Sequence, residues 1–160
     1  MNYKDKPICI IPARGGSKRI KNKNIKNFKG KPLIVHAIQL AKKSKIFKEI
    51  IVSTDSARIR KLSEKNGALV PFVRNKKLSS DTAGTDSVIS DCIKKINSQG
   101  TSFHFCIYPT SPLLTINDLK KAYKKIIKTN FERLVAVGEF NFSPLRAFQI
   151  VNKNKIKYKF

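Results

Sequence analysis

The chain lacks the features that mark membrane-spanning and secreted proteins. No apolar run approaches the roughly 20 residues that cross a bilayer. The segment Met1–Lys6 leads into the first apolar stretch without the long apolar core or cleavage site of a signal peptide. Three widely spaced cysteines argue against a disulfide framework and predict small buried side chains. They are Cys9, Cys92 and Cys106. We therefore expect a cytoplasmic, reduced protein.

Histidines and acidic residues are also scarce. His36 and His104 lie far apart, with no Cys or carboxylate at ligand spacing, so structural roles are favoured over zinc binding. The 10 acidic residues face 34 Lys and Arg, which gives a net charge of +24. Charge alone would indicate binding to nucleic acid or to an anionic membrane. The lysines are scattered along almost every segment, however, which favours solvated helix faces over a nucleic-acid surface.

Short segments rich in Ile and Val alternate with longer amphipathic segments. With 160 residues and 41% hydrophobic content, one domain is expected. Strands are predicted over 8–11, 49–52, 69–72, 103–108 and 134–137, and helices over 33–41, 59–63, 88–96 and 115–127. Gly67 should end the second helix, and Thr115 should cap the fourth with Asp118 in its first turn. The alternation predicts an α/β fold with a mostly parallel sheet. A hairpin is predicted from 148–151 and 156–160, turning through 152–154.

The most informative stretch is 10–24, where an apolar strand opens into a loop of glycines and cations. Gly15 and Gly16 are expected to turn with positive φ and to leave main-chain N–H groups for anionic oxygens. The loop lacks the Gly-Lys-Ser/Thr ending of a Walker loop and the third glycine of a dinucleotide fingerprint. A different polyphosphate cradle is therefore predicted, with a forked guanidinium and two mobile ammonium groups. These cations are Arg14, Lys18 and Lys23.

Polar clusters follow three further predicted strands. They are Ser53–Asp55, Arg74 with 78–82, and Tyr108–Pro112. Each cluster alone could be an ordinary turn or helix cap. Because the carboxyl ends of parallel strands meet at one edge of a sheet, their convergence indicates a ligand site there.

Together these segments resemble the sugar cytidylyltransferases that activate nonulosonic acids, namely the acylneuraminate and pseudaminic acid cytidylyltransferases. IPARGGSKRIKNKN is similar to their nucleotide loop, IIVSTD to their second strand, VPFVR with LSSDTAGT to their base-recognition region, and YPTSP to their sugar-side loop. The resemblance covers essentially the whole chain. It implies a Rossmann-like, doubly wound, mostly parallel sheet of the nucleotide-diphospho-sugar transferase type.

The resemblance also implies a reaction. The anomeric hydroxyl of a nonulosonic acid attacks the α-phosphate of CTP, and pyrophosphate leaves. Bringing an anionic sugar acid to an anionic triphosphate makes electrostatic stabilisation the main requirement, with help expected from Mg²⁺. The partners implied are CTP and the sugar acid, together with a homodimer in full-length members.

Site residues carry over from the resemblance position by position. Arg14 and Lys23 are implied as catalytic, within a CTP-binding set of Ala13, Arg14, Gly15, Gly16, Ser17, Lys18, Lys23 and Asn24. Cytosine would be recognised by Arg74, Ser80 and Thr85. The sugar would lie against Tyr108, Pro109, Thr110, Ser111 and Arg146. Two alternatives stay open: Arg74 as a surface arginine paired with a carboxylate such as Asp81, and Arg146 as a structural arginine at a loop end.

Two departures narrow this interpretation. Neuraminate-specific members resemble a pattern with Gln and Arg where this chain has Tyr108 and Leu114, which favours the pseudaminic acid branch. Second, no acidic residue follows Glu139, so the aspartate-bearing segment that binds magnesium in the family is expected to be missing. Metal ligands stay unassigned, with Asp55, Asp81 and Asp86 as candidates, although a role as a cap, a turn residue or a partner of a lysine is favoured for each. We expect a nucleotide-binding domain over residues 1–145 and a C-terminal segment over 146–160, in a truncated chain. Such a chain would keep the CTP-binding half and lack part of the catalytic machinery, so strong catalysis by this chain alone is not expected.

Other functions compete with this one. Acylneuraminate or legionaminate could replace pseudaminic acid as the sugar. A non-catalytic CTP-binding subunit could require a second chain for activity. A basic nucleic-acid-binding protein rests on charge alone and predicts affinity that falls steeply with salt.

Overall fold

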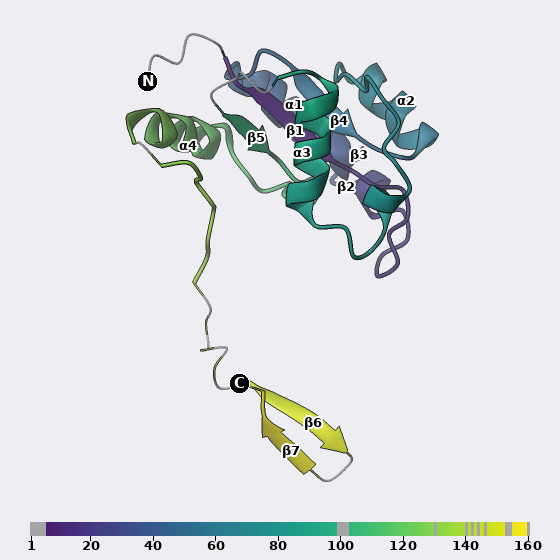
Figure 1. The fold of residues 1–160 in the computed structure, drawn as a ribbon, viewed down its shortest axis with the longest axis vertical. Coiled ribbons are helices and arrows are strands. Elements are labelled where there is room, and N and C mark those ends of the chain that lie inside the picture. Colours follow the sequence, from purple (N-terminus) through teal and green to yellow (C-terminus); the bar gives the residue numbers. More distant parts are fainter. Residues whose placement is uncertain are drawn as a thin grey trace. The chain divides into compact units, whose positions relative to one another are not determined.

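The computed structural model describes residues 6–98, 103–129, 131–139, 141, 143, 145, 147–152 and 155–159. The chain divides into two compact units, Met1–Asn130 and Phe131–Phe160. The first contains the parallel sheet and four α-helices, and the second contains an antiparallel pair of strands (Figure 1). Arg146, proposed above to contact the sugar, lies outside the described residues.

The sheet of the first unit is built around β1 (Ile8–Pro12), with β4 (Ile50–Ser53) on one side and β5 (His104–Cys106) on the other. Both pairings are parallel, and Cys9 lies opposite Ile50 and Phe105. The first four residues of β1 are buried, as expected of a strand covered on both faces.

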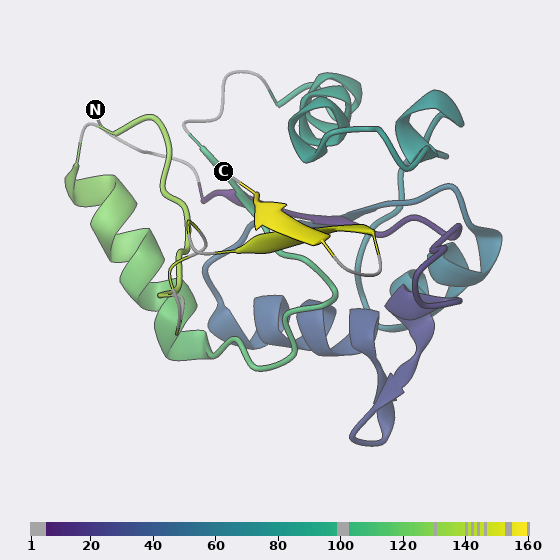
Figure 2. The same cartoon turned by 90° about the horizontal axis from the view of Figure 1, so that it is seen from below.

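Helices cover both faces of this sheet, as Figure 2 shows from below. Cys9 and Ile11 join one apolar cluster with residues of α1 (Leu33–Ser44), α2 (Ala57–Lys65) and α4 (Ile116–Lys128). Ile8 and Ile10 point to the opposite face, where they cluster with Cys92 of α3 (Thr85–Lys95). Alternate residues of one strand therefore anchor the two layers of helices.

Shorter elements complete the two units. A tight antiparallel pair, β2 (Asn27–Phe28) and β3 (Lys31–Pro32), turns through Lys29 and Gly30 at positive φ. Two 3-10 helices, η1 (Lys23–Ile25) and η2 (Lys77–Ser79), lie in the loops that follow β1 and α2. In the second unit β6 (Phe148–Asn152) pairs with β7 (Lys155–Tyr158), so the predicted hairpin is confirmed within the described residues.

The four predicted helices are confirmed. Gly67, at φ 85°, closes the turn after α2. Thr115 caps α4: its hydroxyl accepts from the amide of Asp118, and the Asp118 carboxylate accepts from the amide of Thr115. This reciprocal pair is a capping box.

Two predicted strands are wrong. Segment 69–72 contributes only isolated bridges, of Leu69 to Ile51 and, just past its end, of Val73 to Thr54. Pro71 has no N–H to donate, so a continuous ladder cannot form across it. Segment 134–137 is not a strand either, because it has no pairing partner among the described residues.

The cysteine prediction holds for two residues of three. Cys9 and Cys92 are buried, but Cys106 is exposed, since it ends the edge strand β5 of the described sheet. Both histidines have structural partners: His36 Nε2 lies 2.7 Å from the Phe28 carbonyl oxygen, and His104 Nε2 lies 2.8 Å from Ser98 Oγ. Among the described helices, none has both the length and the apolar character needed to cross a membrane.

The capping box predicts the effect of one substitution. Thr115→Ala should lower the free energy of unfolding by about 1 kcal/mol, because two N-terminal hydrogen bonds of α4 are lost. Urea denaturation would measure this difference. Ser90→Ala, at an exposed position inside α3 and away from both of its caps, serves as the control and should not lower the free energy of unfolding. Equal losses in both variants would contradict the cap.

The same box predicts a pH dependence. Hydrogen bonds from the Thr115 hydroxyl and amide lower the pKa of Asp118 below its usual value. A carboxyl group with a lower pKa in the folded state stabilises the fold above its unfolded pKa, and this contribution disappears as pH falls through the folded pKa. The destabilisation caused by Asp118→Asn should therefore be present at pH 7 and absent in strong acid. A constant difference across unfolding curves from pH 7 to pH 2 would contradict this.

Candidate functional site

A cavity of about 200 Å³ opens where β1 ends and the polar clusters converge. Its lining includes these predicted site residues: Arg14, Ser17, Lys23, Asn24, Arg74, Ser80, Thr85, Tyr108, Pro109 and Thr110. The structure thus brings together residues from three separate parts of the sequence, 14–24, 74–85 and 108–110, while Ser53–Asp55 lies outside the lining. Ala13, Gly15, Gly16, Lys18 and Ser111 lie outside the lining.

The loop after β1 is held by hydrogen bonds to β4 and to the turn that follows β4. The amide of the buried Ala13 donates to the Ser53 carbonyl at 2.9 Å, which extends the parallel ladder by one residue. The amide of Gly15 then donates to Asp55 Oδ1 at 2.8 Å. One amide predicted to face a ligand is therefore already bound within the protein.

The predicted positive φ at the two glycines of the loop is wrong, and a different reason for glycine exists at one of them. Neither Gly15 nor Gly16 has positive φ; in the described chain the glycines at positive φ are Gly30 and Gly67. A Cβ on Gly15 would lie 2.9 Å from Ser56 Cβ, whereas one on Gly16 would meet nothing within 4 Å. Close approach to Ser56 explains Gly15, and nothing in the structure explains Gly16.

Asn24 closes the other end of the cradle. It is buried, and its side-chain amide donates to the Arg14 carbonyl at 2.9 Å. Its neighbour Lys23 begins η1 and lines the cavity, where it adds a positive charge. The side chain of Asn24 therefore sets the path of the backbone at Arg14, which in turn sets where the guanidinium begins.

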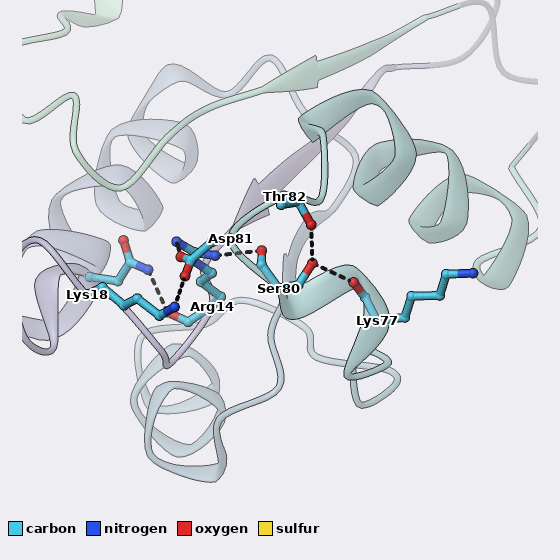
Figure 3. A network of polar contacts seen from close by, with 7 residues as sticks. Arg14, Lys18, Lys77, Ser80, Asp81 and Thr82 are labelled. Carbon is cyan, nitrogen blue, oxygen red and sulfur yellow. Dashed lines mark hydrogen bonds and ion pairs between the residues drawn. The ribbon is translucent and has the colours of Figure 1, made fainter.

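The cations of the cradle meet a carboxylate from the 78–82 segment. Arg14 donates to the Ser80 carbonyl at 2.6 Å and to Asp81 Oδ1 at 2.5 Å, and Lys18 Nζ lies 2.7 Å from Asp81 Oδ2 (Figure 3). Hydrogen bonds from Lys18 and Arg14 lower the pKa of Asp81 below its usual range. Asp81 is therefore an anion that bridges two cationic side chains, both predicted to bind the triphosphate.

Arg74 occupies a different environment. Only 4% of the residue is exposed, and its guanidinium donates to the hydroxyl and the carbonyl of Ser53. The alternative in which Arg74 pairs with Asp81 is not what the structure shows, because Asp81 binds Arg14 and Lys18 instead. Burial lowers the pKa of Arg74, while nearby Asp55 opposes that shift. The result is a fixed cation at the wall of the cavity.

Residues predicted for the base and for the sugar touch each other. The hydroxyls of Thr85, at the start of α3, and Tyr108, after β5, lie 2.8 Å apart. Pro109 and Thr110 follow Tyr108 on the lining, and the amide of Ser111 turns back to the Tyr108 carbonyl at 3.2 Å. Thr85 and Tyr108 thus join the α3 side of the cavity to the β5 side.

Sequence reasoning placed Ser53 and Asp55 at this edge of the sheet but did not predict their supporting roles. Ser53 holds Arg74, and Asp55 holds Gly15. The signal for Ser53 was a polar residue continuing a buried apolar strand, since Ser53 and Thr54 are almost completely inaccessible. A buried hydroxyl requires a hydrogen-bond partner, and here the partner is the buried guanidinium of Arg74.

No group of three or more metal-ligating side chains is found in the part of the chain that the structure describes. Asp81 is bound to two cations and Asp55 accepts from Gly15, while Asp86 lies in the first turn of α3. These carboxylates do not form a cage of oxygen ligands for Mg²⁺. The magnesium expectation stays a prediction.

The two glycines of the loop predict contrasting substitutions. Gly15→Ala should destabilise the fold by about 1 to 2 kcal/mol and weaken binding of inorganic tripolyphosphate, because the loop must move away from Ser56. Gly16→Ala is the matched control and should leave both properties nearly unchanged, since its Cβ meets open space. Thermal unfolding and calorimetric titration would measure the two effects. An equal response of both variants would contradict the close approach.

Comparison with known proteins agrees with this geometry. A cytidylyltransferase family model matches residues 8–158. The chain is 45% identical over 153 residues to the pseudaminic acid cytidylyltransferase of Campylobacter jejuni, covering 94% of this chain and 66% of that relative. It is 34% identical over 139 residues to the CMP-N,N′-diacetyllegionaminic acid synthase of Legionella pneumophila, covering 86% of this chain and 60% of that relative. The chain thus spans just under two thirds of the length of these relatives.

Solved structures show the same fold. A CMP:2-keto-3-deoxy-manno-octonic acid synthetase complexed with CTP superimposes with a TM-score of 0.66 at 22% identity, covering 78% of this chain and 48% of that chain. The predicted doubly wound α/β sheet of the nucleotidyltransferase type is confirmed. With a family match over nearly its full length, a conforming fold and a cradle at the end of β1, the chain belongs to the cytidylyltransferase family.

Proposed function

We propose that this protein binds CTP in the cavity at the end of β1 and serves the transfer of CMP to pseudaminic acid, with release of pyrophosphate. The observation that carries the proposal is the cavity itself, which brings cations after β1 together with Arg74 and Tyr108. The 45% identity to a relative named pseudaminic acid cytidylyltransferase supports the choice of sugar.

In this proposal the cradle binds the triphosphate. Arg14 and Lys23 offer charged donors, and Ser17 adds a hydroxyl on the same wall. Cations placed before the substrate arrives stabilise the charge that develops at the α-phosphate without reorganisation during the reaction. Arg14 and Lys23 are therefore the residues to which we assign catalysis.

Arg74 is proposed to recognise cytosine. Its guanidinium is immobilised by Ser53, so its remaining N–H donors have a fixed direction. Cytosine offers a carbonyl acceptor, which would meet Arg74, and an amino donor. The amino group would face the hydroxyl or backbone groups of Ser80 and Thr85. Uracil has a carbonyl in place of the amino group and would lose that interaction.

The proposed reaction is a displacement at phosphorus. The anomeric oxygen of the sugar acid forms a bond to the α-phosphorus, the bond from that phosphorus to the bridging oxygen of pyrophosphate breaks, and the hydroxyl proton leaves to solvent or a base. The chain contributes mainly by binding and charge neutralisation, as phosphoryl-transfer enzymes generally do. Tyr108 and Thr110 would lie on the sugar side.

Calorimetric titration with CTP, UTP and ATP, each with magnesium and at moderate salt, tests nucleotide binding. We expect CTP to bind at least tenfold more tightly than UTP, a difference of about 1.4 kcal/mol. Equal binding of all three, weakening together as salt rises, would show that the lysine-rich surface merely collects polyanions. The same result would remove the role assigned to Arg74.

A pair of lysine variants tests the cradle. Lys23→Gln should weaken CTP binding by roughly tenfold, because Lys23 lines the cavity. Lys21→Gln, two residues away and exposed, removes the same charge and should change affinity by less than about twofold. Comparable losses in both variants would assign the effect to overall charge.

Pyrophosphate release tests the acceptor. Turnover of CTP by this chain alone should be weak, because its described residues hold no group of three or more metal-ligating side chains. The turnover that does occur should be faster with pseudaminic acid than with N,N′-diacetyllegionaminic acid or N-acetylneuraminic acid. Faster turnover with another of these acids would support the proposed reaction and replace pseudaminic acid as its proposed acceptor. Selective CTP binding without turnover on any of them would favour the alternative of a non-catalytic CTP-binding subunit.

A further inference from the structure

One carboxylate contacts two cations of the loop after β1: Arg14, which the proposed function assigns to the triphosphate, and Lys18, which the family resemblance places in the CTP-binding set. Asp81 Oδ1 lies 2.5 Å from Arg14 and Asp81 Oδ2 lies 2.7 Å from Lys18. Each carboxylate oxygen thus contacts one cation. Two oxygens of a phosphate group would bind the same two donors in the same bridging manner.

We propose that Asp81 is an internal competitor of the polyphosphate: it bridges Arg14 and Lys18 when no nucleotide is bound and is displaced when the triphosphate binds. This inference rests on the proposed function, since it concerns the same cradle. It assigns to Asp81 a role in setting affinity and selectivity, and leaves direct contact with CTP to the cations.

The first argument is electrostatic. Hydrogen bonds from both cations hold the pKa of Asp81 below its usual range, so the group is charged at neutral pH. A triphosphate placed on Arg14 would bring further negative charge next to that carboxylate, and like charges at such distances repel. Because the two anions share their donors, one must withdraw when the other binds.

The second argument is that the contact can break at low cost. The side chain of Asp81 is 38% exposed and that of Lys18 is 85% exposed, so water can solvate both groups after separation. Ion pairs as accessible as this one contribute little to folding stability. A buried pair would instead leave an uncompensated charge on separation.

The third argument is that the segment bearing Asp81 has hydrogen bonds of its own. The Ser80 hydroxyl donates to the Lys77 carbonyl at 3.0 Å and lies 3.2 Å from the hydroxyl of Thr82 (Figure 3). The Ser80 carbonyl also accepts from Arg14 at 2.6 Å, a contact that involves no acidic group. Release of Asp81 therefore leaves the local turn and one link to the cradle in place.

The position of the segment gives the exchange a consequence. Ser80 lies between Arg74 and Thr85 in sequence, and all three line the cavity and are proposed to meet cytosine. Displacement of Asp81 by the triphosphate would act directly on the segment that recognises the base. Small anions gain too little from two cations to displace Asp81, whereas a triphosphate reaches further donors such as Lys23. In a chain of net charge +24, such competition limits occupation of the cradle by unrelated anions.

Asp81→Asn tests the inference, with inorganic tripolyphosphate and CTP as probes in calorimetric titrations. We expect both probes to bind roughly tenfold more tightly to the variant, because the competing charge is gone while the shape of the side chain is kept. Glu64→Gln is the matched control, because it removes the same charge. Glu64 pairs with Arg60 at 3.2 Å and lies on α2, outside the cavity lining. This control should change affinity by less than about twofold.

A double-mutant cycle adds specificity. In a Lys18→Gln background one of the two bridged cations is absent, so the gain from Asp81→Asn should shrink to a few-fold. Should Asp81→Asn prove poorly folded by circular dichroism, Asp81→Ser removes the charge at the same exposed position and carries the same expectation. An unchanged gain in the Lys18→Gln background would overturn the bridging role.

Weaker binding, or a change no larger than that of Glu64→Gln, would also overturn the inference and make Asp81 a positioning residue or a bystander. The two proposals fail separately. Tighter tripolyphosphate binding by Asp81→Asn without preference for CTP over UTP would support the competitor and reject the nucleotide assignment. Selective CTP binding that Asp81→Asn leaves unchanged would support the nucleotide assignment and reject the competitor role of Asp81.

Discussion

The pairing of β1 with a strand on each side is the interaction on which the rest of the structure depends. The buried residues of β1 anchor helices on both faces of the sheet. The hydrogen-bond ladder between β1 and β4 continues past the end of β1, from the Ala13 amide to the Ser53 carbonyl. On the other side, the amide of Ile107 donates to the Ile10 carbonyl at 3.1 Å, just before Tyr108. Backbone hydrogen bonds of one buried strand therefore place both the cradle and the opposite wall of the cavity.

Scarcity of acidic residues makes the location of each carboxylate informative. Among the described residues, two of the four ion pairs belong to Asp81, and both involve cations of the cradle. Asp55 is committed to the Gly15 amide. In a chain with an excess of positive charge, counter-charge is thus concentrated beside the loop that is proposed to bind a polyanion. The two carboxylates act differently there: Asp55 fixes the backbone of the loop through the Gly15 amide, whereas Asp81 balances the charge of the loop through contacts that water can replace.

The fold was predictable where a periodic pattern ran long enough to specify one element. The helix that begins at Leu33 shows this through its apolar spacing, and the helix after Thr115 through apolar spacing together with a capping sequence. Prediction failed where tertiary context decided. Pro71 interrupts a segment whose composition indicates a strand, and the exposed Val137 belongs to one with no partner strand in the described chain. Cys106 is exposed at the end of β5, which is an edge strand of the sheet within the described residues, and no local sequence pattern reveals this.

The sequence predicted which residues gather at the candidate site, but it did not predict which of them contact one another. Convergence at strand ends brings Arg14, Arg74 and Tyr108 to one cavity, but it does not say which arginine meets which partner. The structure separates the two arginines by environment. Arg74 is buried on Ser53 and cannot move without losing those hydrogen bonds, whereas Arg14 holds a partner that water can replace. A fixed guanidinium suits recognition of a base, which requires defined direction, and an exchangeable one suits a triphosphate, which must displace a competing anion to enter.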